Sequence, residues 1–219
     1  MSKSHPHQWT IGTDVERPDP ALVAELAGLA TTQVADCGGP VGVVGPGIRR
    51  LAGDGGMCGP AVTVWTKPGD ILFVLKAVDL VTPGDVLLID GGARADAAVI
   101  GDIVGKALAD AGCVGLVVDG AIRDVDGIDE VGLPAFARGA HPATGSNTGP
   151  GAINVTVQCG GGAVSPGEGV LADGRPCGGP RSRAARACRR PPGSTPCSPS
   201  CGRGRSHRPR MPARQTGGP

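Results

Sequence analysis

Two short apolar segments, VLLID at residues 86–90 and VGLVVD at residues 114–119, constrain the fold more than any other feature of this 219-residue chain. Both are too short for helices and are typical of strands that are buried on both faces of a sheet. The stretch between them, residues 93–111, has a helical pattern that is clearest from Gly101 onward and ends at Gly112. The order strand, helix, strand predicts parallel neighbouring strands and therefore an α/β fold.

The flanking segments extend this pattern. We expect helices at residues 20–30, 31–36, 71–80 and 128–131, with Asp19 as the N-cap of the first and Thr31 or Thr32 as that of the second. Further strands are expected at residues 61–66, 134–138 and 153–158, and one begins within residues 164–172. Residues 120–124 are expected to form a turn after the second apolar strand. These elements predict one α/β domain.

The composition changes abruptly after residue 173. Residues 174–219 hold 11 of the 21 basic side chains, none of the 20 acidic ones, and no Val, Ile, Leu or aromatic residue. The net charge of +1 therefore averages a body of about −10 and a tail of +11. We expect a flexible N-terminus at residues 1–17, a folded domain at 18–173 and a disordered basic tail at 174–219, because the tail has nothing with which to form a core.

The tail allows three interpretations. Cys197 and Cys201 have the spacing of a zinc-ligand pair, but the gaps to Cys177 and Cys188 fit no regular zinc finger. Eleven arginines suggest phosphate binding, but aromatic stacking partners are absent, so we expect no specific nucleic-acid binding. The mixture of Arg, Pro, Gly, Ala, Ser and Cys is also what GC-rich coding DNA yields when it is read out of frame, and this interpretation is the most economical.

The remaining bulk features favour a cytoplasmic protein. No apolar run reaches the ~18 residues of a membrane span, and the first ten residues lack the apolar stretch of a signal peptide. The cysteines of the body are far apart and mostly lie beside apolar residues or glycine, so we expect free thiols rather than disulfides. These are Cys37, Cys58, Cys113 and Cys159.

Polar residues that could carry chemistry follow the apolar strands, where ligands bind in α/β folds. The helix start Gly101-Asp102-Ile103-Val104 offers unpaired amides for a carboxylate. Arg123 could grip the same anion, Asp124 could hold a divalent cation, and Asp102 could position or deprotonate a water. Such a set would stabilise an enolate. There is also a purely structural interpretation, in which Arg123 and Asp124 form a surface ion pair and Asp102 is an aspartate favoured at the start of a helix by the helix dipole.

Several blocks occur in the order that is typical of one family. The segments CGPAVTVWTKPGD (58–70), PGDVLLIDGG (83–92) and GLVVDGAIRDVDGI (115–128) resemble the RraA-like family, whose signature is an acidic residue, about twenty positions, and then Arg-Asp. Here Asp102 is followed after twenty residues by Arg123 and Asp124. The resemblance covers roughly residues 18–173 and includes GLPAFARGAHPATG and GAINVTVQCGG farther on.

The resemblance implies a layered α-β-β-α domain that forms homotrimers or homohexamers. It also implies a class II 4-hydroxy-4-methyl-2-oxoglutarate aldolase, a lyase that uses Mg²⁺ or Mn²⁺ to release pyruvate from a small 2-oxo acid and that decarboxylates oxaloacetate. By similarity, residues 101–104 bind the pyruvyl carboxylate, Arg123 grips the pyruvyl group, Asp124 binds the metal and Asp102 orients a water.

Two other functions follow from the same resemblance. One branch of the family inhibits ribonuclease E without aldolase activity, but it lacks the Asp-x20-Arg-Asp set that this chain has. Some members carry the label demethylmenaquinone methyltransferase, although LLIDGGARAD (87–96) lacks the third glycine of a dinucleotide-type loop.

The sequence departs from the family after residue 174. Family members continue with an apolar strand, a long helix and an acidic residue that reaches a neighbouring subunit. Here no Asp or Glu follows Asp173, and we expect the loss of that strand to expose an edge of the sheet.

Overall fold

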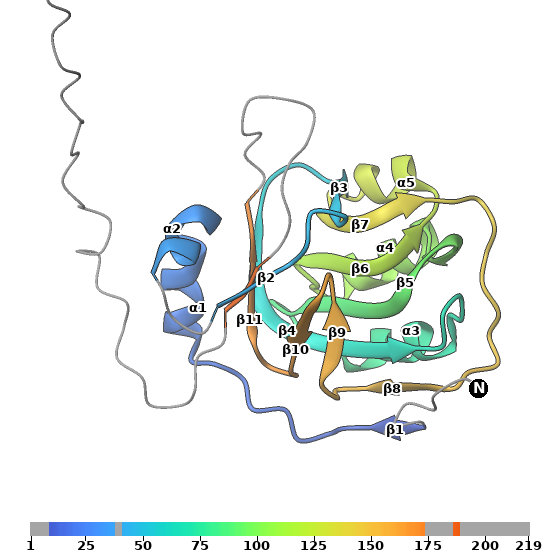
Figure 1. The fold of residues 1–219 in the computed structure, drawn as a ribbon, viewed down its shortest axis with the longest axis horizontal. Helices are drawn as coiled ribbons and strands as arrows, with labels where there is room; N and C mark the ends of the chain where they lie inside the picture. The colour runs from blue at the N-terminus through green and yellow to red at the C-terminus, as the bar shows by residue number, and fades with distance from the viewer. Residues whose placement is uncertain (1–8, 38–40, 174–185, 189–219) are drawn as a thin grey trace, which may run out of the picture.

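The protein is built on a ten-stranded mixed sheet (Figure 1). Its computed structural model describes residues 9–37, 41–173 and 186–188. The main path of the sheet runs β2-β12-β11-β4-β5-β6-β7-β3, and β8 and β1 continue from the side of β4. A separate hairpin joins β9 (Val157–Cys159) to β10 (Gly162–Val164). The α/β class and the layered arrangement of helices and sheet are thus as predicted.

Four parallel strands form the centre of the sheet: β4 (Met57–Thr66), β5 (Val86–Ile100), β6 (Gly115–Ile122) and β7 (Ala135–Ala140). The apolar segments at 86–90 and 114–119 lie side by side in register, from Val86 opposite Gly115 to Asp90 opposite Asp119. Residues 86–90 and 115–119 are all buried, as expected for strands covered on two faces, and Val114 is partly buried.

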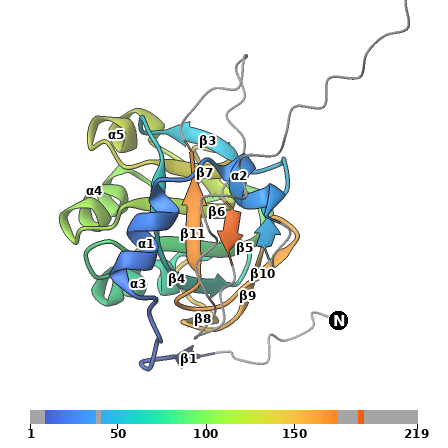
Figure 2. The same cartoon turned by 90° about the vertical axis from the view of Figure 1, so that its left-hand side faces the viewer.

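Helices cover one face of the sheet and the β9–β10 hairpin covers the other (Figure 2). The first face packs against α3 (Leu72–Ala77), α4 (Asp102–Asp110) and α5 (Val125–Glu130), with the 3-10 turn η1 (Val78–Leu80) after α3. The two apolar layers lie on opposite faces of the sheet, because alternate side chains of one strand point to opposite faces. Val118 packs in the helix layer and Val117 in the hairpin layer.

The longest strand differs most from the sequence prediction. Residues 93–100, which we expected to open a helix, continue β5, and the helix begins only at Asp102. Gly92 and Ala93 have positive φ and let β5 bend through an exposed segment. Along this bend β5 stays paired with β6, with shifts in register, at Arg94, Ala98 and Ile100. For the same reason β6 extends to Ile122, so most of the expected turn at 120–124 is strand. Pairing between the strands outweighs the helix propensity of an alanine-rich segment.

Two smaller predictions were also wrong. The helix α2 (Thr31–Asp36) has Ala30 as its N-cap, while the Thr31 amide and hydroxyl donate to Asp173 at 3.0 and 2.7 Å. The expected strand at 153–158 is two strands, β8 (Gly151–Ile153) and β9, because Asn154 takes a left-handed conformation with φ of 55° and turns the chain between them. The helix α1 (Pro20–Ala27), by contrast, is capped by Asp19 as predicted, with the Ala21 amide donating at 2.8 Å.

The edge at β11 (Gly169–Ala172) has a strand partner from the tail. The strand β12 (Arg186–Cys188) pairs antiparallel with β11 and, on its other side, with β2 (Val41–Val43). At the far end of the sheet, β3 (Arg49–Ala52) pairs with β7. The prediction of an exposed edge beside β11 is therefore wrong. The predicted disorder of the tail otherwise falls on residues 174–185 and 189–219, outside the described residues.

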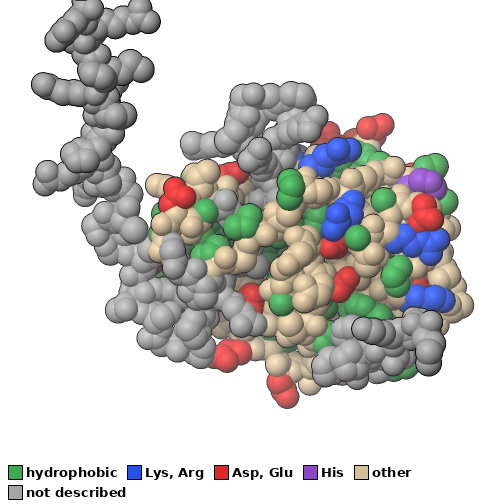
Figure 3. Space-filling view, in the orientation of Figure 1, with side chains coloured by type: hydrophobic (Ala, Val, Ile, Leu, Met, Phe, Trp, Pro, Cys, Tyr) green, Lys and Arg blue, Asp and Glu red, His purple; other side chains and the backbone are tan. Residues whose placement is uncertain are grey.

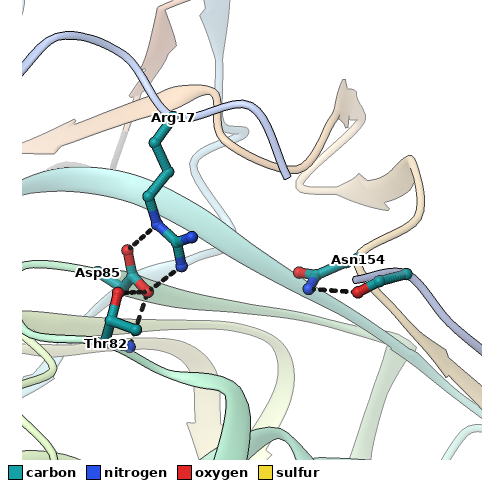
Figure 4. A network of polar contacts seen from close by, with 5 residues as sticks. Arg17, Thr82, Asp85 and Asn154 are labelled. Atoms are coloured by element: carbon teal, nitrogen blue, oxygen red, sulfur yellow. Dashed lines mark hydrogen bonds and ion pairs between the residues drawn. The ribbon is translucent and has the colours of Figure 1, made fainter. Parts of the chain in front are cut away.

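The segment before α1 is attached to the domain (Figure 4). Arg17 forms a two-pronged ion pair with Asp85, Nε to Oδ1 at 3.2 Å and Nη2 to Oδ2 at 2.8 Å, and Thr82 donates its amide and hydroxyl to the same carboxylate. Nearby, β1 (Thr10–Ile11) pairs with β8 and the Asn154 amide group donates to the Gly12 carbonyl. Of the N-terminus expected to be flexible, residues 1–8 lie outside the described part.

Within the described residues, no disulfide joins the cysteines of the body, as expected. Burial is the main cause that raises the pKa of Cys113 and that of Cys159. Within the described ranges, none of the helices combines the length and the apolar character that crossing a bilayer requires.

Candidate active site

The predicted site residues lie at the carboxyl edge of the parallel strands. There β5 leads through Gly101 into α4, β6 leads through Arg123 and Asp124 into α5, and β7 leads into a loop at residue 141. Backbone hydrogen bonds hold the three strand ends together, from the Arg123 amide to the Ile100 carbonyl at 2.8 Å and from the His141 amide to the Ile122 carbonyl at 2.9 Å. Figure 3 shows acidic, basic and histidine side chains gathered on this right-hand edge.

The start of α4 presents Asp102 and three residues of the predicted carboxylate-binding loop. Gly101 is the N-cap, Asp102 is the first helical residue, and Ile103 is 77% exposed. The Asp102 carboxylate accepts a hydrogen bond from the Ile103 amide at 2.8 Å, so in this conformation it occupies one amide of its own helix start. A substrate carboxylate that uses this amide must displace the Asp102 side chain.

Arg123 and Asp124 form an ion pair between β6 and α5. The Arg123 Nε lies 3.1 Å from the Asp124 Oδ2, and the two side chains are 38% and 47% exposed. Asp124 is the N-cap of α5 and has a left-handed backbone with φ of 50° and ψ of 47°, a conformation that aspartate tolerates better than most residues. Solvent and a small anion can therefore reach both groups.

Two glycines allow α4 and α5 to approach each other at this point. A Cβ on Gly101 would lie 2.7 Å from the Asp124 Oδ2 and 3.0 Å from the Arg123 Nε. A Cβ on Gly127, in α5, would lie 2.7 Å from the Asp102 Cβ. The structure thus brings Gly101, Asp102, Arg123 and Asp124 into one cluster. Sequence reasoning missed Gly127, although a glycine inside a short helix is a signal for close packing.

A buried carboxylate organises the loop that borders the site. Asp70 follows β4 and is fully buried, and its Oδ2 accepts from the Ser146 hydroxyl at 2.7 Å and from the Thr148 and Gly149 amides at 2.8 and 3.0 Å. Burial raises the pKa of Asp70, but these bonds, together with that from the Leu72 amide, outweigh it and hold the pKa below its usual value. The loop after β7 is thereby fixed against β4.

The donor set of the cluster fits a largely hydrated magnesium ion. The part of the chain that the structure describes has no group of three or more His, Cys, Asp or Glu side chains that could enclose a metal. Magnesium, however, keeps several waters and binds through one or two carboxylates together with its substrate. The half-exposed Asp124 carboxylate offers such a ligand and leaves room for water.

The chain belongs to the RraA-like family of Aldolase/RraA proteins, which it matches over residues 27–175. A protein of Halalkalibacterium halodurans named "Putative 4-hydroxy-4-methyl-2-oxoglutarate aldolase" is 36% identical over 152 residues, which are 69% of this chain and 72% of that protein. The family that we predicted from the sequence is therefore confirmed.

Two solved structures carry other descriptions. Streptomyces coelicolor RraAS2, described as an unusual member of the RNase ES inhibitor RraA protein family, has a TM-score of 0.67 and 29% identity and covers 79% of this chain and 86% of its own. A Geobacillus kaustophilus protein described as an S-adenosylmethionine:2-dimethylmenaquinone methyltransferase has a TM-score of 0.65 and 27% identity and covers 73% and 94%. The shared fold thus occurs with three different descriptions.

Proposed function

We propose that the protein is a divalent-metal-dependent lyase that cleaves 4-hydroxy-4-methyl-2-oxoglutarate, or related 4-hydroxy-2-oxo acids, to pyruvate and also decarboxylates oxaloacetate. The observation that carries this proposal is the meeting of Asp102, Arg123 and Asp124 where the starts of α4 and α5 touch. The identity to a relative named as such an aldolase supports it.

Arg123, the start of α4 and Asp102 would each have a separate role in the reaction. In the aldol substrate, the proton leaves the C4 hydroxyl, the bond between C3 and C4 breaks, and its electron pair forms the enolate of pyruvate. The Arg123 guanidinium binds the pyruvyl group and stabilises the negative charge on the enolate oxygen. Amides at the start of α4 bind the substrate carboxylate once Asp102 turns away from Ile103. Asp102 then positions the water that carries protons.

Asp124 would hold the metal, largely through waters. A bound Mg²⁺ or Mn²⁺ would supply positive charge to the same enolate oxygen. The resemblance further implies a homotrimer or homohexamer with sites completed between subunits, and size-exclusion chromatography with light scattering tests the assembly. The cytoplasmic location that we expect from the sequence is part of the same proposal. The acidic residue that family members provide after residue 174 has no counterpart in this chain, so the proposal depends on the groups of the body.

Pyruvate release from oxaloacetate in the presence of Mg²⁺ tests the proposal. We expect turnover by the purified full chain, loss of turnover on removal of the metal with a chelator, and at least a ~100-fold lower kcat/KM in Arg123→Ala and Asp124→Ala, the range measured for loss of one oxyanion-stabilising group. The control is Lys106→Ala, which breaks the exposed ion pair with Asp110 on α4. Activity that needs no metal, or that is unchanged in both variants, contradicts the mechanism.

The likeness to RraAS2 favours one alternative, regulation of ribonuclease E. A pull-down with purified ribonuclease E, together with the absence of turnover, would support that function instead. The methyltransferase alternative has less support, because the Gly91-Gly92 segment continues within β5 and does not open a helix as a dinucleotide-type loop does.

A further inference from the structure

The contact between α4 and α5 is closer than ordinary side chains allow. Three glycines face the opposite helix or its N-terminal residues: Gly101 and Gly105 on the side of α4, and Gly127 on the side of α5. At Gly105 a Cβ would lie 3.1 Å from the Ile128 Cγ1. The contacts at Gly101 and Gly127 are shorter and involve the three charged residues of the site.

Gly127 differs from Gly101 in what an added Cβ would meet. At Gly101 the nearest atoms, the Asp124 Oδ2 and the Arg123 Nε, belong to side chains that can rotate away. At Gly127 the nearest atom is the Asp102 Cβ, at 2.7 Å, with the Asp102 Oδ2 and Cγ at 3.4 and 3.5 Å. Since a Cβ moves only with its backbone, no change of rotamer relieves this contact, and the start of α4 must move away from α5.

We propose that Gly127 is a positioning residue for Asp102: it sets the distance between the start of α4, which carries Asp102, and the start of α5, which carries Asp124. The inference rests on the proposed function, because it assigns Gly127 a role through the carboxylate that positions the water. Catalytic groups must be held within about 0.5 Å of their productive geometry, and a displacement of about 1 Å can reduce turnover about 100-fold.

The variant Gly127→Ala tests this with one methyl group. Alanine favours a helix more than glycine does, but moving the start of α4 costs stability, so we expect the two effects to offset each other and the melting temperature to change little. We expect kcat for oxaloacetate to fall about tenfold, since the contact must lengthen from 2.7 Å toward the 3.4 Å of ordinary packing, a shift of less than 1 Å. KM should change less than kcat, because the amides at the start of α4 move by less than 1 Å and Arg123 keeps its place.

The matched control is Gly28→Ala at the end of α1, where the backbone is helical and a Cβ would meet only the Glu25 carbonyl, at 3.4 Å. This variant should keep wild-type kcat. A kcat of Gly127→Ala within twofold of wild type would overturn the inference, and so would a loss in KM alone.

Crystal structures of the wild type and Gly127→Ala separate this inference from the proposed function. If the wild type releases no pyruvate, the proposed function fails, but the position of Asp102 can still be compared between the two structures. The inference expects the Asp102 Cβ to move away from residue 127 by several tenths of an ångström. An alanine accommodated with Asp102 in its original place would overturn it.

Discussion

Single residues fix the surroundings of the candidate site. The buried Asp70 accepts four hydrogen bonds, three from the loop after β7 and one from the start of α3. The backbone of Arg123 is held by a hydrogen bond from its amide to the Ile100 carbonyl at the end of β5. Asp102 is partly exposed and Asp124 is exposed, whereas Asp70 is fully buried, so replacing one of its oxygens should have a large structural effect.

Asp70→Asn should lower the free energy of unfolding by about 2–3 kcal/mol, because an amide NH2 group replaces an oxygen that accepts from several donors. Urea unfolding followed by circular dichroism measures this. The control is Asp110→Asn, an exposed position on α4 that should change the free energy little. Equal stability of the Asp70 variant and the wild type would contradict the role of this network.

The same residue predicts a pH dependence. Since the pKa of Asp70 is lower in the folded state than its unfolded value of about 3.9, its contribution is fully present above that value. The contribution is lost as the pH falls through the lower, folded pKa. Between pH 5 and 2.5, the stability of Asp70→Asn should therefore fall less steeply than that of the wild type. Parallel curves for the two proteins would show that Asp70 does not titrate in this way.

Elements were predictable where a local pattern decides them. The strands β4, β6 and β7 and the helices α1 and α3 follow from apolar runs, caps and turn residues within a few positions. The second half of β5 was not predictable in this way, because an alanine-rich segment becomes a strand only when it lies beside β6. The separation of β8 from β9 depends on the left-handed Asn154 and its contact with Gly12, residues 142 positions apart.

The site shows the same division. Arg123 and Asp124 were named from the polar residues after the apolar strand β6, Asp102 was named from the expected start of a helix, and the family signature links all three. Gly127 was not named, because its importance depends on how closely α4 and α5 approach, a distance that only the packing of both helices on the sheet determines.

The segment that precedes α1 should depend on its ion pair with the sheet. Arg17→Ala should lower the free energy of unfolding by about 1–2 kcal/mol, since Asp85 is 1% exposed and would lose its cation, although Arg17 itself is partly screened by solvent. Arg17→Lys should be intermediate, because lysine cannot form the two-pronged contact. Chemical unfolding and limited proteolysis near residue 17 measure the effect. Equal protection of all three proteins would contradict it.

The whole molecule depends on pairings made late in the sequence. A chain truncated after Asp173 lacks β12 and leaves the edges of β11 and β2 unpaired. Unpaired edges promote association between chains, so this truncation should aggregate at lower concentration than the full chain in light-scattering measurements. A full chain with Ala187→Pro, which removes an amide in the middle of β12, is a second test that keeps the rest of the tail, and it should behave in the same direction. Unchanged solubility of both would show that β12 does not protect the sheet.

The position of β11 has a consequence for synthesis on the ribosome. The strand β4, at residues 57–66, is among the first of the central strands to be made, but its antiparallel partner β11 is more than a hundred residues away. During that interval the nascent chain carries an apolar strand with an open edge, and at 5–20 residues per second the interval lasts about 5–20 seconds. Until β11 is made, the edge of β4 is therefore open to pairing with other chains or to binding by a chaperone.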